Sequence, residues 1–92
     1  MHKTIEENTA FLIEVLEAGP CRMGWEPGAR FFCEYECPAG FCPKTTAALH
    51  TLCECVRAGG DLRLLGGSAA GTMDFCCADG VVRFRLTGWK KP

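Results

Sequence analysis

The sequence predicts a small α+β domain, in which an antiparallel sheet of β-β-α-β-β order is covered by one helix. Three observations predict it: alternating apolar segments in the first third, one amphipathic segment in the middle, and a strong hairpin signal in the last third. The chain has 92 residues, of which 48% are hydrophobic, and this suits a single domain over residues 1–92. We expect an ordered core over about residues 10–89 and a frayed terminus at residues 1–8.

Two strands are expected before the helix. Residues 11–16 combine alternation with an apolar run that ends before Gly19-Pro20, a pattern typical of a strand. Alternation resumes after a turn-rich segment, where Phe31, Cys33 and Tyr35 share one face of a second strand.

A helix is expected from about Pro43 to Arg57. Proline is favoured at the first helical position, and Gly59-Gly60 supplies a left-handed stop. The stretch over residues 64–71 has no clear period and predicts a loop. Helical periodicity predicts an apolar face and an opposite polar face, formed respectively by Ala48, Leu49, Leu52 and Val56 and by His50, Glu54 and Arg57.

The last third carries the strongest local signal. Asp79-Gly80 lies between two alternating segments, residues 72–78 and 81–87, and predicts a two-residue hairpin turn. A register slip of one residue would bury Arg83 and Arg85, so the pairing is well specified. The turn predicts an apolar face with the pairs Cys77–Val82, Phe75–Phe84 and Met73–Leu86, and a polar face with Cys76–Arg83 and Asp74–Arg85.

Charge and the N-terminal sequence exclude several classes of function. The formal net charge of -1 provides no basic field for nucleic acid. Residues 1–8 lack the basic patch and apolar run of a signal peptide, and Glu14 interrupts the nearest apolar stretch. That stretch is far shorter than the roughly 20 residues of a membrane span. We therefore expect a cytoplasmic protein with reduced thiols that binds neither nucleic acid nor membrane.

Eight cysteines are the unusual feature of the composition. In a reducing compartment they indicate metal ligation or redox chemistry more than disulfides. Four of them suit simple packing, because a free cysteine behaves as a small buried hydrophobe. One of the four is Cys77, on the apolar face of the predicted hairpin. Cys33 is expected on the core face of its strand, and Cys53 and Cys55 lie about 200° apart around a helix, too far to bind one ion together.

The remaining cysteines are the candidate site. Cys42 immediately precedes the helix, where the dipole and free N–H groups stabilise a thiolate. Cys37 precedes it by five positions, a C-x4-C spacing that allows two sulfurs to bind one metal. Cys21 lies in the other turn-rich loop, and Cys76 is beside Arg83 on the hairpin. Sulfurs gathered at one end of the sheet would suit zinc or an iron–sulfur cluster.

These residues resemble a family of small, cysteine-containing bacterial and archaeal proteins of uncharacterised function, over about residues 10–87. Members typically have Cys-Pro-Asp where this chain has Cys77-Ala78-Asp79, and a Trp where it has Lys44-Thr45. The resemblance implies a site of Cys21, Cys42 and Cys77 with Cys76 beside it, and no established activity. Its landmarks are Gly19-Pro20-Cys21-Arg22-Met23-Gly24, Gly28, Gly40-Phe41-Cys42-Pro43, Gly59-Gly60, and Cys77-Ala78-Asp79 before Val81-Val82.

Three functional hypotheses follow. The leading one is a metal-binding module in which Cys21, Cys42 and Cys76 or Cys77, with Cys37, hold zinc or an iron–sulfur centre. The second is a thiol redox protein or thiolate enzyme that uses Cys42 with another cysteine as resolving partner. The third is an interaction domain with merely structural cysteines. The partner, a protein or a small molecule, stays open, as do the substrate and the oligomeric state.

Overall fold

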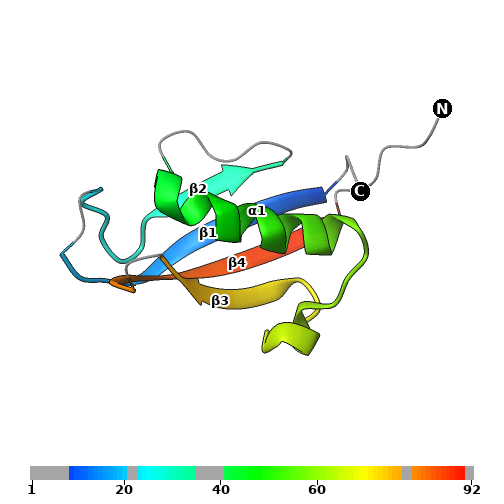
Figure 1. The fold of residues 1–92 in the computed structure, drawn as a ribbon. Helices are drawn as coiled ribbons and strands as arrows, with labels where there is room; N and C mark the ends of the chain where they lie inside the picture. The colour runs from blue at the N-terminus through cyan, green and yellow to red at the C-terminus, as the bar shows by residue number, and fades with distance from the viewer. Residues whose placement is uncertain (1–8, 21–22, 35–40, 78–79, 91–92) are drawn as a thin grey trace.

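The computed structural model describes residues 9–20, 23–34, 41–77 and 80–90. These residues form one sheet with a helix across one of its faces, which confirms the predicted α+β fold (Figure 1). Within these ranges no helix has the length and apolar character needed to cross a membrane. The elements in chain order are β1 (Thr9–Ala18), β2 (Arg30–Cys33), α1 (Pro43–Arg57), the 3-10 helix η1 (Leu62–Leu65), β3 (Thr72–Cys76) and β4 (Val82–Lys90).

The centre of the sheet is the pairing of β1 with β4. The strand order is β2-β1-β4-β3, and all three pairings are antiparallel. The β1–β4 ladder runs from Thr9 opposite Lys90 to Ala18 opposite Val82, with a bulge between Val15 and Glu17. β1 is therefore longer than the predicted strand at residues 11–16, because a partner from the far end of the sequence extends it at both ends.

The predicted hairpin register is confirmed where the structure describes it. Four facing pairs agree with the prediction, and the Cys77 N–H continues the ladder by donating to the Val82 carbonyl at 2.9 Å. The turn itself differs from the predicted two-residue turn: Gly80 has a left-handed φ of 75°, but its N–H donates to the Cys77 carbonyl at 2.9 Å, so the hydrogen-bonded ladder closes at Cys77 and Val82. The turn residues Ala78 and Asp79 lie outside the described residues. The agreeing pairs are Met73–Leu86, Asp74–Arg85, Phe75–Phe84 and Cys76–Arg83.

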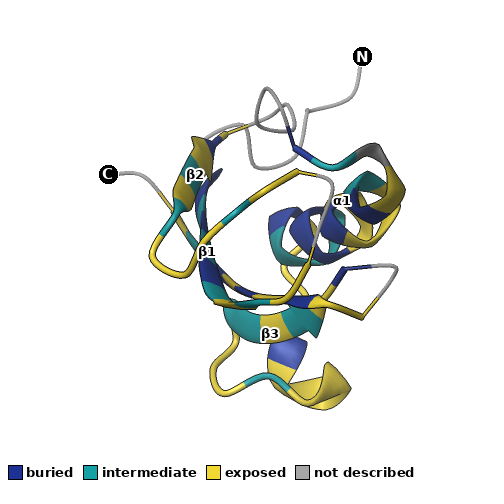
Figure 2. Ribbon diagram, turned by 90° about the vertical axis from the view of Figure 1, so that its left-hand side faces the viewer, coloured by how far each residue is buried: buried dark blue, intermediate teal, exposed yellow. Residues whose placement is uncertain are grey.

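The two faces of the sheet differ in what covers them. α1 lies on one side only (Figure 2). Buried residues alternate with partly buried ones in β1 and with exposed ones in the first half of β4. The inner face carries the fully buried Phe11, Ile13, Phe84 and Leu86, which pack in one core with Leu49 of α1. The outer face carries ion pairs between neighbouring strands, such as Arg85 with Asp74.

The buried face of α1 differs from the predicted one. Leu49 and Leu52 are buried as expected, but Ala48, expected on the apolar face, is exposed. Arg57, expected on the polar face, has only 3% of its surface exposed. Its guanidinium lies 5.0 Å from the centre of the Phe11 ring, so the helix is rotated to bury a charged group that periodicity assigns to solvent.

The predicted loop at residues 64–71 begins with regular structure. η1 covers Leu62–Leu65, and the Asp61 carboxylate caps it by accepting a hydrogen bond from the Arg63 N–H at 3.0 Å. Leu62 is fully buried and anchors the segment to the core. The prediction was wrong at residues 64 and 65 because one buried leucine and a cap hold a turn too short to show a period.

Candidate functional site

The predicted metal ligands do not form a cluster in the described part of the chain. Cys21 and Cys37 lie outside the described residues, which leaves Cys42, Cys76 and Cys77 to examine. Among the described residues, no group of three or more histidine, cysteine, aspartate or glutamate side chains could hold a metal ion. The three cysteines therefore do not make a metal centre by themselves.

Cys76 and Cys77 lie on opposite sides of the sheet. Cys76 is exposed and faces Arg83 on the outer side, as predicted. Cys77 is buried and belongs to the hydrophobic core with Phe84. Adjacent residues of an extended chain point to opposite faces, so these two sulfurs cannot both approach one ion while the ladder is intact.

Cys42 lies directly before α1, as the sequence predicts. It is the N-cap residue, and its carbonyl accepts hydrogen bonds from the Thr45 and Thr46 N–H groups, each at 3.1 Å. The neighbouring Phe41 is buried between the rings of Trp25 and Phe84, with centroid distances of 5.2 and 5.3 Å. This end of the helix therefore joins aromatic packing at Phe41 to a half-buried thiol at the next residue.

A pair of thiols lies instead between β2 and the second half of α1. Cys33 ends β2 on the inner face, opposite Phe11 of β1, and Cys53 faces it from α1. Both are thiols, with 8% and 3% of their surface exposed. The Cys53 thiol hydrogen-bonds to the Cys33 sulfur, so residues 20 positions apart in the sequence touch through their side chains.

Arg57 places a positive charge beside this pair. It follows Cys53 by one helical turn, so both side chains lie on the same face of α1. The guanidinium donates to the backbone carbonyl of Glu34, the residue after Cys33, at 2.6 Å, and also to the Glu54 carboxylate. These bonds, with the contact to the Phe11 ring, fix the cation at the end of β2.

The surroundings of Cys33 favour its thiolate. The hydrogen bond from Cys53 is the largest influence and lowers the pKa of the Cys33 thiol below its ordinary value. Burial acts in the opposite direction, and the positive charge of Arg57 adds to the lowering of that pKa. A stabilised thiolate in contact with a second thiol can form a disulfide, which is the chemistry that this arrangement supports.

Nothing in the sequence pattern predicted this site, although the burial of two of its residues was predicted. Cys33 and Cys53 were expected to be buried, and they are. The only local signal was the spacing of Cys53 and Arg57, four residues apart on one helix. Because Arg57 was expected on the polar face of the helix, that spacing did not indicate a site. The approach of Cys33 to Cys53 depends on tertiary packing, which local pattern does not show.

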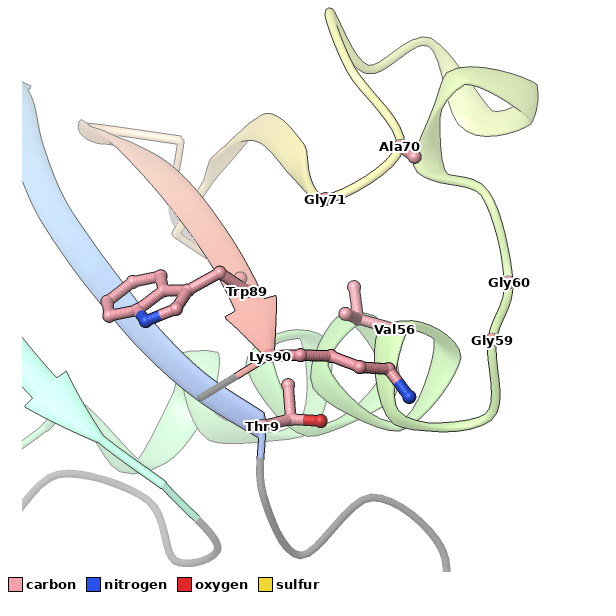
Figure 3. A pocket seen from close by; sticks show the side chains of 9 residues that line it. Thr9, Val56, Gly59, Gly60, Ala70, Gly71, Trp89 and Lys90 are labelled. Carbon is pink, nitrogen blue, oxygen red and sulfur yellow. The ribbon is translucent and has the colours of Figure 1, made fainter. Parts of the chain in front are cut away.

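A cavity of about 230 Å³ lies near the C-terminal end of α1 (Figure 3). The Thr9 hydroxyl beside it is buried and has no hydrogen-bond partner among the described residues, but its oxygen has almost no accessible surface to offer a ligand. Phe11 stands between Cys33 and Gly88 in the sheet, so it separates the thiol pair from the cavity. The lining includes Thr9, Gly59, Gly60, Gly71, Gly88 and Lys90.

Comparison with known proteins adds no assignment to this geometry. No family model, curated protein or solved structure matches the chain. The resemblance to the small cysteine-containing family and the zinc or iron–sulfur site therefore stay predictions. The contact of Cys33 with Cys53 beside the charge of Arg57 is the feature of the molecule that points to a function.

Proposed function

We propose that this protein is a thiol redox protein whose working pair is Cys33 and Cys53. One observation carries the proposal: the two buried thiols are hydrogen-bonded to each other across β2 and α1. The proposal keeps the second hypothesis from the sequence but transfers the reactive thiol from Cys42 to Cys33. Cys53 takes the part of the resolving cysteine.

The pair works by exchanging two electrons. In the reduced form the Cys33 thiolate accepts the hydrogen bond of the Cys53 thiol beside Arg57. Oxidation removes two electrons and two protons and joins the sulfurs, which links β2 to α1. Groups that stabilise a thiolate favour the reduced form, so they raise the reduction potential of the disulfide. This property distinguishes a reversible redox disulfide from a structural one.

Among the described residues, the contact of Cys33 with Cys53 supports the redox hypothesis, whereas no group of side chains there supports the metal-binding hypothesis. A structural zinc site takes four ligands, whereas Cys33 and Cys53 provide two. Anaerobic purification and elemental analysis compare the two hypotheses directly. Stoichiometric zinc or iron that blocks oxidation of Cys33 would favour the metal-binding module, whereas a metal-free, folded protein with a reactive pair would favour the redox protein.

Redox titration tests the proposal. The reduced protein is equilibrated in glutathione buffers of graded potential, its thiols are trapped by alkylation, and its disulfides are assigned by peptide mapping. We expect a Cys33–Cys53 disulfide with a potential above about −300 mV, the range of labile disulfides. Cys76→Ser is the matched control, because it removes an exposed cysteine on the other face of the sheet. The titration is approached both from the reduced protein and from protein oxidised beforehand with peroxide, so that slow access of glutathione does not hide the equilibrium. Absence of this disulfide from both starting points, or a potential well below that range, would overturn the proposal.

A further inference from the structure

We infer that the oxidant of the Cys33–Cys53 pair is a small hydroperoxide of the hydrogen peroxide class and not a bulky disulfide. The inference rests on the redox function proposed above and names its substrate class. The observation behind it is the burial of both sulfurs between β2 and α1, where Cys33 is only 8% exposed.

The packing around the sulfurs limits what can reach them. Phe11 is the neighbour of Cys33 across the sheet, and α1 covers Cys33 with the side chains of Cys53 and Arg57. Thiol–disulfide exchange requires a disulfide, with a substituent on each sulfur, to approach the attacking thiolate directly. A hydroperoxide presents an O–O bond with one small end. As long as β2 and α1 stay packed together, the closed site therefore favours a hydroperoxide over a disulfide as the oxidant.

Charge favours the same chemistry. When a thiolate attacks a peroxide, negative charge moves from sulfur to the departing oxygen. The Arg57 guanidinium is held beside the pair by the Glu34 carbonyl and the Glu54 carboxylate, so it does not have to reorient as the charge moves. An arginine stays protonated throughout, which makes Arg57 a positioning residue and not a proton donor.

The reaction balances in two steps. The Cys33 thiol first ionises. Its thiolate attacks one peroxide oxygen, the O–O bond breaks, and the hydroxide that leaves is neutralised to water by the proton that Cys33 released, which gives Cys33 sulfenic acid. The Cys53 sulfur then attacks the oxidised sulfur as its thiol proton is lost, the S–O bond breaks, and water leaves. Overall, two thiols and one peroxide give one disulfide and two waters. The sulfurs supply the two electrons that reduce the peroxide.

Competition between two oxidants tests the inference on the full chain. The reduced protein is mixed anaerobically with hydrogen peroxide or with the same concentration of glutathione disulfide, then quenched at intervals and mapped. We expect peroxide to form the Cys33–Cys53 disulfide roughly tenfold faster or more, because burial limits access of the larger molecule. Cys76→Ser should leave both rates unchanged.

The resolving step has its own readout. Replacing Cys53 by Ser should stop the reaction at Cys33 sulfenic acid, which dimedone captures as a stable adduct. Cys53→Ala gives the same readout if the serine variant does not fold. Failure to capture a sulfenic acid in a folded variant would overturn the peroxide inference.

The two proposals can fail separately. If glutathione disulfide oxidises the pair as fast as peroxide, the peroxide inference is wrong and the redox function stands. If neither oxidant joins Cys33 to Cys53, both proposals are wrong.

A further experiment tests the role of Arg57. Replacing Arg57 by Met should slow oxidation by peroxide and move the pH profile of the oxidation rate to higher pH, and replacing it by Lys should restore part of the rate. Equal pH profiles for the wild type and Arg57→Met would show that Arg57 has no part in the reaction.

Discussion

The two ends of α1 contrast in the side chains that surround them. At the first end, Phe41 packs among Trp25, Phe31 and Phe84, with ring centroids 5.2 to 5.5 Å away. Towards the other end, the helix places Cys53 and a charged guanidinium over β2. Aromatic packing holds the fold at one end, and titratable groups meet at the other.

A stabilised thiolate can arise away from the N-terminal end of a helix. The helix dipole favours an anion at the N-terminal end, which is why Cys42 is the expected nucleophile, and it disfavours one towards the C-terminal end. Cys33 lies on the unfavourable side of this field. Its thiolate is stabilised there by a hydrogen bond from Cys53 and by the charge of Arg57.

The largest effect should come from the aromatic end. Replacing Phe41 by Ala removes a side chain that is 6% exposed from a packed cluster, so it should lower the free energy of unfolding by about 3–5 kcal/mol. Urea denaturation measures the loss. Leu64→Ala is the control, since Leu64 is 85% exposed and should change stability by less than about 0.5 kcal/mol. Equal losses in the two variants would contradict the packing role of this end.

The next effect concerns the thiol end. A disulfide between Cys33 and Cys53 closes a loop of about 20 residues, and loop-closure entropy predicts a gain of about 3 kcal/mol over the reduced protein. Denaturation of the oxidised and reduced forms measures this gain. The Cys53→Ser variant should show no difference between the two conditions. A disulfide that lowers stability would mean that the two sulfurs are badly placed for bonding.

A smaller effect is a pH dependence. The pKa of the Cys33 thiol is lowered in the folded state, so the folded protein releases this proton at lower pH than the unfolded chain does. The resulting stabilisation is complete above the unfolded value of about 8.5 and is lost as pH falls through the folded pKa. Denaturation at graded alkaline pH should therefore show a rise in stability that Cys33→Ser lacks. Parallel curves for the two proteins would argue against the lowered pKa.

The smallest effect belongs to the outer face of the sheet. Arg85 donates to Asp74 at 2.8 Å in an exposed ion pair, which should contribute only slightly to stability in a double-mutant cycle because solvent screens it. The hydrogen bond from Arg85 lowers the pKa of Asp74, so this contribution is present above about pH 3.9 and is lost as pH falls through the lowered value. Asp74→Asn should leave oxidation of Cys33 unchanged. A change in that oxidation would mean that the two faces are coupled.

Local pattern predicted much of the fold. The bounds of α1 follow from Pro43 and Gly59, and the register of the β3–β4 hairpin follows from alternation around Asp79-Gly80. The central pairing of β1 with β4 joins the two ends of the sequence, so no local pattern indicates it. That pairing fixes which residues meet across the core.

The candidate site was beyond sequence reasoning for the same physical reason. Burial of Cys33 and Cys53 follows from pattern, but their contact depends on how α1 lies over β2. Arg57 was misplaced because periodicity treats every charge as a solvent-facing group. A guanidinium that contacts the Phe11 ring and hydrogen-bonds to the Glu34 carbonyl and the Glu54 carboxylate can be buried.

Disulfide mapping after limited oxidation tests the pairing of Cys33 with Cys53 most directly. The fully reduced wild-type protein is treated with one equivalent of hydrogen peroxide, alkylated, digested and analysed by mass spectrometry. The predicted result is a dominant peptide that joins Cys33 to Cys53, with the exposed Cys76 still alkylated. Oxidation that leaves Cys33 and Cys53 reduced while Cys42 or Cys76 reacts would contradict the account.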